Sequence, residues 1–216
     1  MSAASAQAAV FIGISLDGGA TISNVFSDLD DGTFNYARDC TNVADCGGFE
    51  TVTVRGDAPP RPGILHSDAV DVNARNTGGA SIVVFVTRTD LTPLSAKQYQ
   101  SYTTNNVGGP VSSDLSTLVS ASNQLFAGTQ IGGFNNNTNG SANLNLTTFF
   151  DFSAPGTYSV THKYIITAPN SPNSQRSASP TIGTAVPEPG TWALMILGFG
   201  GAGAVLRTQR RKLATA

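Results

Sequence analysis

The residues best suited to chemistry are two histidines, His66 and His162, which could act as general acid and base if the fold brought them together. They lie far apart in the chain, and no G-x-S-x-G, H-E-x-x-H or P-loop motif is present. Glutamate occurs only at Glu50 and Glu188. We therefore predict that the chain is not an enzyme and uses no cofactor, and that the histidines are surface or structural residues.

Two cysteines, Cys40 and Cys46, are separated by five residues. In an exported protein this spacing favours a disulfide, and closing so short a loop stabilises a fold by about 2–3 kcal/mol. Two free thiols are the alternative. We predict no metal site here, because two sulfurs do not complete a tetrahedral site and neither histidine is near in sequence.

An acidic stretch contains Asp28, Asp30 and Asp31, whose oxygens make it a weak calcium candidate. The EF-hand register is absent, because Gly32 comes one position too early. Asp31-Gly32 is more typical of a hairpin turn before a strand at 33–37, which is the interpretation we favour.

Composition indicates one exported, β-rich domain. Of 216 residues only 12% are charged, about half the usual share, and the net charge is −2. A near-neutral balance argues against nucleic acid as a partner. The 23 glycines and 11 prolines are unfavourable for long helices.

Alternating apolar and polar residues predict a mostly antiparallel β-sandwich, jelly-roll or Ig-like, over 10–168. We expect the apolar segment 80–89 in the middle of a sheet, a hairpin over 144–168, and a short helical turn at 95–102. Residues 114–126 fit either a helix or a strand. The expected strands are 10–17, 21–26, 33–37, 49–55, 64–74, 80–89, 142–152 and 157–168.

The segments flanking this domain look unlike a packed core. Residues 1–9 contain Ala6-Gln7-Ala8, the small-residue pattern at the end of a signal peptide, so we expect translation to start further upstream; a disordered N-terminus is the alternative. Residues 169–186 are rich in Ser and Pro, which predicts a disordered linker.

The C-terminal stretch has three parts in order: Pro187-Glu188-Pro189, an apolar run from Trp192 to Leu206, and a basic cluster of Arg207, Arg210, Arg211 and Lys212. As a helix, residues 191–206 reach about 24 Å, short for a bilayer core of about 30 Å. Trp192 and the arginines can extend that span at its two ends. We predict a single transmembrane helix with its basic end in the cytoplasm and the rest of the chain outside.

Residues 187–213 resemble the PEP-CTERM sorting signal in its PEPxxWA variant, through Pro187, Glu188, Pro189, Trp192 and Ala193 followed by the apolar run and the arginines. The resemblance implies processing by exosortase, a membrane peptidase, with this chain as substrate. Similar C-terminal regions also carry an ice-binding heading. The resemblance implies anchoring at the inner membrane before processing, then release to the cell surface or extracellular matrix.

The resemblance points to a structural or adhesive component of the exopolysaccharide matrix of a biofilm. A carbohydrate- or ice-binding module is the alternative, and a secreted hydrolase a more distant one. Ice binding requires a regular Thr-x-Thr ladder, whereas only Thr51/Thr53 and Thr87/Thr89 have that spacing. The ligand of the β-domain, the cleaved bond and the oligomeric state do not follow from these patterns.

Overall fold

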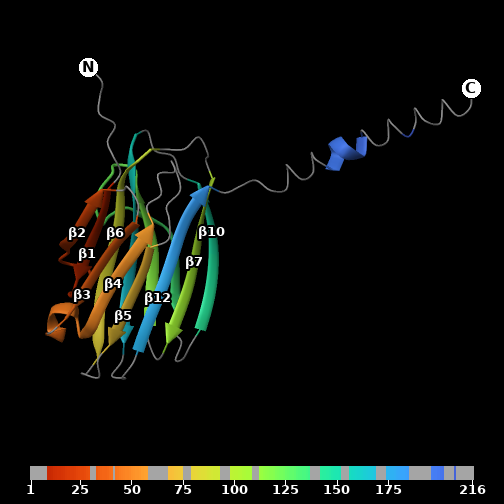
Figure 1. The fold of residues 1–216 in the computed structure, drawn as a ribbon. Helices are drawn as coiled ribbons and strands as arrows, with labels where there is room; N and C mark the ends of the chain where they lie inside the picture. The colour runs from red at the N-terminus through yellow and green to blue at the C-terminus, as the bar shows by residue number, and fades with distance from the viewer. Residues whose placement is uncertain are drawn as a thin grey trace, which may run out of the picture. The chain divides into compact units, whose positions relative to one another are not determined.

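The computed structural model forms two compact units, Met1–Thr184 and Ala185–Ala216. It describes residues 9–29, 33–40, 42–57, 68–74, 79–92, 98–108, 112–136, 142–151, 156–168, 174–184, 196–201 and 207. The first unit is built of antiparallel strands in two layers, with a short 3₁₀ helix, η1 (Val43–Cys46), between β3 and β4 (Figure 1). The strands are β1 (Ala9–Ser15), β2 (Ser23–Leu29), β3 (Thr33–Asp39), β4 (Phe49–Asp57), β5 (Asp68–Ala74), β6 (Ala80–Leu91), β7 (Gln98–Gly108), β8 (Ser112–Ser120), β9 (Thr129–Asn136), β10 (Ala142–Asp151), β11 (Tyr158–Ala168) and β12 (Ser174–Thr184).

The strands form two six-stranded sheets, which we name sheet A and sheet B. Sheet A has the order β2-β1-β6-β11-β8-β9, and sheet B has the order β10-β7-β12-β5-β4-β3. The predicted mostly antiparallel β-sandwich is therefore confirmed. As expected for the most apolar segment, β6 lies inside its sheet, between β1 and β11, and is buried along nearly its whole length.

Among the residues whose burial the structure describes, the hydrophobic core lies between sheet A and strands β3 and β4 of sheet B. Burial alternates along strands such as β4 and β8, because successive side chains of a strand point to opposite faces. In β4, for example, Val52 and Val54 are fully buried, whereas Thr51 and Thr53 are only half-buried. The core comprises Val10, Ile12, Ile14, Phe34, Cys40, Cys46, Phe49, Val52, Val54, Ala80, Ile82, Val84, Val86, Leu115, Tyr164, Ile166 and Ala168.

The predicted hairpin over 144–168 is wrong. Strand β10 pairs with β7 in sheet B, whereas β11 pairs with β6 and β8 in sheet A. The Asp31-Gly32 hairpin is wrong for the same reason: β2 pairs with β1 in sheet A, and β3 pairs with β4 in sheet B. A turn sequence predicts that the chain reverses, but it does not decide whether the next strand joins the same sheet or the opposite one.

Two local predictions also change. The helical turn expected at 95–102 is replaced from Gln98 onward by β7, which pairs on both edges, with β10 and β12. A single helical turn is unstable by itself. The backbone hydrogen bonds that β7 makes with both β10 and β12 therefore favour the strand over the helical turn. Of the two alternatives at 114–126, a strand forms up to Ser120, and burial alternates at Ser113, Leu115, Thr117 and Val119.

The disordered linker expected over 169–186 contains a strand. Residues Ser174–Thr184 form β12, which pairs with β5 and β7 inside sheet B. Backbone hydrogen bonds on both sides order a segment whose composition offers little apolar surface. Pro180 lies beyond the part of β12 that pairs with β5, where a missing N–H is tolerated.

Candidate functional sites

The predicted sorting residues Pro187, Glu188, Pro189, Trp192 and Ala193 lie outside the described residues, as do Arg210, Arg211 and Lys212. In the second unit, 196–201 and Arg207 are described; they are helical and exposed. Three large apolar side chains of this unit, Ile196, Leu197 and Phe199, are 69–76% exposed. Within the described part of the chain, no helix has both the length and the apolar composition to cross a bilayer.

The residues considered for chemistry in the first unit do not form a site that the structure describes. His162 lies in β11, 1% exposed, in register with Val86 and Thr117. His66 lies outside the described residues, as do the calcium candidates Asp30 and Asp31, whereas Asp28 is exposed on β2. Among described residues, no three His, Cys, Asp or Glu side chains are placed to hold a metal ion.

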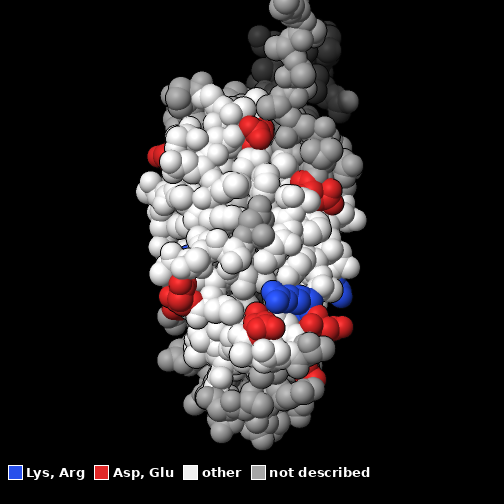
Figure 2. Space-filling view, turned by 90° about the vertical axis from the view of Figure 1, so that its left-hand side faces the viewer, with Lys and Arg blue, Asp and Glu red and all other residues white. Residues whose placement is uncertain are grey.

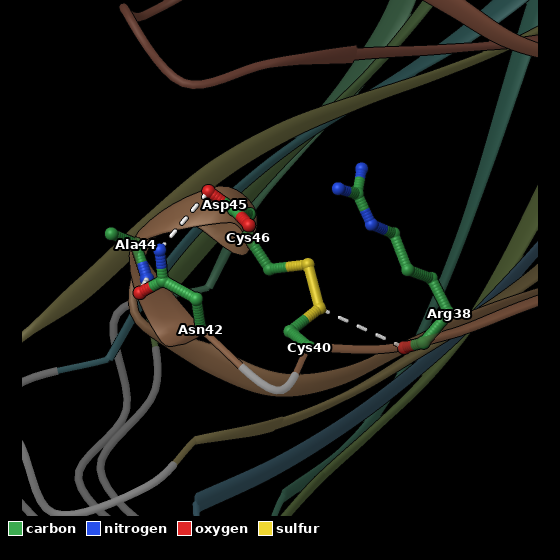
Figure 3. Close-up of a disulfide and its surroundings, with 6 residues drawn as sticks. All are labelled: Arg38, Cys40, Asn42, Ala44, Asp45 and Cys46. Carbon is green, nitrogen blue, oxygen red and sulfur yellow. Dashed lines mark hydrogen bonds between the residues drawn. A yellow bond between two sulfur atoms is a disulfide. The ribbon is translucent and has the colours of Figure 1, made fainter.

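The predicted disulfide between Cys40 and Cys46 is present, and both sulfur-bearing side chains are buried. Figure 3 shows it linking the end of β3 to η1. Asn42 shapes the enclosed loop: its backbone carbonyl accepts from Asp45 N at 3.0 Å, and its side-chain oxygen accepts from Ala44 N at 3.3 Å. Its amide nitrogen donates to Asp45 Oδ1 at 3.3 Å. These bonds orient Asp45.

The disulfide loop contacts both sheets. Cys40 N donates to Glu50 O of β4 at 2.8 Å, and Ser81 N of β6 donates to Gly47 O at 2.7 Å. Gly47 and Gly48 adopt φ values of 62° and 96°, which L side chains rarely adopt. A Cβ on Gly47 would also overlap the Ser81 carbonyl oxygen. Only glycine therefore lets the loop lie this close to sheet A.

A hollow of about 320 Å³ lies beside this loop, and we name it the disulfide pocket. Its walls come from β1, the β1–β2 turn, β2, β3 and η1, so both sheets contribute. Arg38 and Asp45 reach to the same side of the disulfide (Figure 3). Its lining residues are Ile14, Leu16, Asp17, Thr21, Ser23, Val25, Arg38 and Asp45.

Asp17 is held in place by the turn that it stabilises. Its Oδ1 accepts from the Ser15 hydroxyl at 2.6 Å and from Thr21 N at 2.9 Å. These hydrogen bonds, the Ser15 bond first, hold the pKa of Asp17 well below its usual range. The Ser15 hydroxyl also accepts from Gly19 N at 2.8 Å. Asp17 is therefore a fixed, ionised acceptor at the pocket.

The surface around the β1–β2 side of the domain is largely uncharged. Figure 2 faces the side on which β1, β2 and β3 lie in Figure 1, and its charged side chains are few and set apart. At one place basic and acidic side chains adjoin. This face thus presents mostly uncharged groups to a partner, with local charges of both signs.

A second, more open hollow of about 520 Å³ follows the β8–β9 loop. Asn123 pins the loop to β6: its Oδ1 accepts from Asp90 N at 2.9 Å and its Nδ2 donates to Asp90 Oδ1 at 2.8 Å. Phe126 packs against Phe85 with ring centroids 5.9 Å apart. Asn123 and Phe126 of the loop and Asp90 of β6 all have positive φ, a backbone conformation that is uncommon for residues other than glycine. The residues that line this second hollow are Val119, Ser120, Ala121, Ser122, Gln124, Gly128 and Thr129.

Sequence patterns missed both hollows. The disulfide pocket combines Leu16 from the β1–β2 turn, Arg38 from β3 and Asp45 from η1. None of these three residues belongs to a sequence motif. The cysteine pair was the one available signal, because a short disulfide loop holds its neighbours in a fixed position. The β8–β9 loop carried no signal beyond its polar composition.

Comparison with known proteins shows that residues 185–212 match the PEP-CTERM protein-sorting motif. The chain therefore carries this sorting motif at the position predicted from Pro187 to Lys212. No curated protein matches the chain.

Solved structures give distant similarities. The enzymatically active domain of tailspike protein 4 of bacteriophage CBA120 is 14% identical with a TM-score of 0.38, over 72% of this chain and 20% of that one. This chain thus spans about a fifth of the tailspike structure. A family 29 carbohydrate binding module from Piromyces equi is 9% identical with a TM-score of 0.33, over 74% and 87%. The PA14 sugar-binding domain from an RTX adhesin is 14% identical with a TM-score of 0.33, over 81% and 90%.

Proposed function

We propose that this chain is an exported protein that an exosortase-type membrane peptidase recognises and processes at its C-terminus. The observation that carries the proposal is the PEP-CTERM match at 185–212. Val186 and Glu188 each precede a proline, which disfavours helix and presents the motif as an extended peptide with one carboxylate. Trp192 and Ala193 complete the recognised element.

The apolar run after the motif is proposed to enter the membrane before processing. Its described part supports this, because it is helical and its large side chains Ile196, Leu197 and Phe199 are all apolar. Arg207, Arg210, Arg211 and Lys212 then remain on the cytoplasmic side, since basic residues flanking a span are retained there. The inner membrane is the anchoring site, and the cell surface or extracellular matrix the destination.

For the β-domain we propose a structural or adhesive role in a hydrated polysaccharide matrix. The sparse surface charge and the disulfide support an extracellular protein that meets neutral partners. Ice binding is not favoured, because Thr87 and Thr89 are 0% and 6% exposed and Thr87 is hydrogen-bonded to Thr161 at 2.7 Å. They are therefore unavailable for a surface threonine ladder.

The proposal is tested by replacing Glu188 and Pro189 together with alanine. We expect processing to stop, because the extended, charged motif is lost, while the unfolding midpoint of the β-domain stays unchanged. The measurement is the intact mass and cell fraction of the native protein, in cells with and without the peptidase. Asp151→Asn, an exposed acid of the β-domain, is the control and leaves processing intact. A mature C-terminus unaltered in the double variant contradicts the proposal.

A further inference from the structure

We infer that the disulfide pocket is a binding site for one neutral sugar unit of a polysaccharide. Its volume of about 320 Å³ lies at the lower end of the range of about 300–1,000 Å³ for ligand sites. It is a built site, because the hydrogen bonds of Ser15, Asn42 and Ser81 fix the segments that supply its walls. The pocket itself is inferred from its geometry. The inference rests on the proposed extracellular role only where it names a polysaccharide as the source of the sugar.

One wall of the pocket is apolar. Ile14 is buried, Val25 is half-buried, and Leu16 is 49% exposed. An exposed apolar side chain at a pocket gains free energy when a ligand covers it. The C–H face of a sugar ring supplies such a cover, whereas a hydrated ion does not.

The polar groups of the pocket include both donors and acceptors. Arg38 is half-buried and its guanidinium carries five N–H donors. Asp17 is held as a carboxylate by hydrogen bonds from Ser15 and Thr21, and it lies in the pocket lining as an acceptor group. Asp45 adds a second carboxylate from η1. Sugar hydroxyls, which donate and accept at once, match this mixture.

The charges determine which sugar fits. Two carboxylates and one guanidinium give the pocket a formal charge of −1. An acidic sugar would be repelled by Asp17 and Asp45, although it could pair with Arg38. A divalent cation would find two carboxylates but no third one among the described residues, and it would leave Leu16 uncovered. A neutral sugar satisfies the donors, the acceptors and the apolar wall together.

The test is isothermal titration of the full-length chain in a detergent without a sugar headgroup. The probes are cellobiose, maltose and lactose, with digalacturonic acid and calcium chloride for comparison. We expect at least one neutral disaccharide to bind with a Kd below about 10 mM, and Arg38→Met and Asp45→Asn each to weaken it about tenfold or more. Arg55→Met, at an exposed arginine on β4, is the matched control and leaves affinity unchanged.

The inference is overturned if no neutral disaccharide binds up to about 10 mM, or if binding survives both pocket variants. Binding of digalacturonic acid or calcium alone also overturns it. Because titration uses purified protein, it is independent of C-terminal processing. If no sugar binds but the C-terminus is processed as proposed, the sugar site is ruled out and the sorting proposal stands. If sugar binds but the Glu188 and Pro189 variant is processed normally, the sorting proposal is ruled out and the sugar site stands.

Discussion

At the scale of single residues, Ser15 and Asp17 act as one unit. Ser15 is 1% exposed at the end of β1, and its hydroxyl donates to Asp17 while accepting from Gly19 N. These side-chain hydrogen bonds help to close the β1–β2 turn. The hydrogen bonds from the Ser15 hydroxyl and from Thr21 N favour the carboxylate form of Asp17, and they lower its pKa.

Replacing Ser15 with alanine is therefore expected to raise the pKa of Asp17 towards its ordinary value of about 4. Since the lowered pKa belongs to the folded state, the stability that Asp17 contributes is present above that ordinary value and is lost as the pH falls through the lowered pKa. In the variant this contribution is smaller at neutral pH. Carboxyl ¹³C NMR titration measures the pKa. Ser27→Ala, on exposed β2, is the control, and an unchanged Asp17 titration in Ser15→Ala contradicts the assignment.

At the scale of elements, the disulfide loop acts as a spacer between the sheets. Reducing Cys40–Cys46 removes about 2 kcal/mol of loop-closure stabilisation for a loop this short. It also frees η1, and with it Asp45, from its fixed place in the pocket lining. Because disulfides form in oxidising compartments, we expect the loop to close only where the chain meets oxidising conditions.

Gly47→Ala and Gly18→Ala are a matched pair for the docking of this loop. Both glycines have positive φ, 62° and 76°, so each alanine suffers backbone strain of about 1–2 kcal/mol. A Cβ on Gly18 meets nothing within 4 Å, whereas one on Gly47 overlaps the Ser81 carbonyl. Urea unfolding is expected to show a clearly larger loss for Gly47→Ala. Equal losses would mean that the loop moves away from Ser81 without cost.

The positions of several strands were predictable from the sequence. Alternating residues located β1, β4 and β6 closely, because one buried face imposes a period of two. The partners of each strand were not predictable, as β10 and β11 show by lying in different sheets. Pairing depends on contacts between distant segments, and only a turn that closes a hairpin reveals them locally.

The candidate sites also include some that the sequence predicts and some that it does not. The sorting motif is contiguous, so Pro187 to Lys212 could be read directly, and the cysteine pair followed from spacing and compartment. The disulfide pocket could not be read, because Leu16, Arg38 and Asp45 acquire a common role only when β1, β3 and η1 meet. Strand β12 was missed because backbone hydrogen bonds to β5 and β7, rather than its own apolar side chains, order this segment.

At the scale of the whole molecule, β12 makes the domain depend on its last residues. A chain ending at Ala185 keeps β12, and we expect it to unfold cooperatively in urea. A chain ending at Ala168 removes β12, which separates β7 from β5 and leaves an edge of each unpaired. We expect this shorter chain to show no cooperative transition by circular dichroism. Equal unfolding midpoints for the two chains would contradict a structural role for β12.

The place of β12 also decides how the domain carries mechanical load. Any pull on residue 185 passes straight into a strand that is paired with β7 up to Thr184 and with β5 over Ser174–Ala178. A strand inside a sheet resists extraction through two ladders, whereas an edge strand peels from one. A pull from the C-terminal side is therefore met first by the β7 ladder at Thr184 and then, from Ala178 inwards, by the β5 ladder as well.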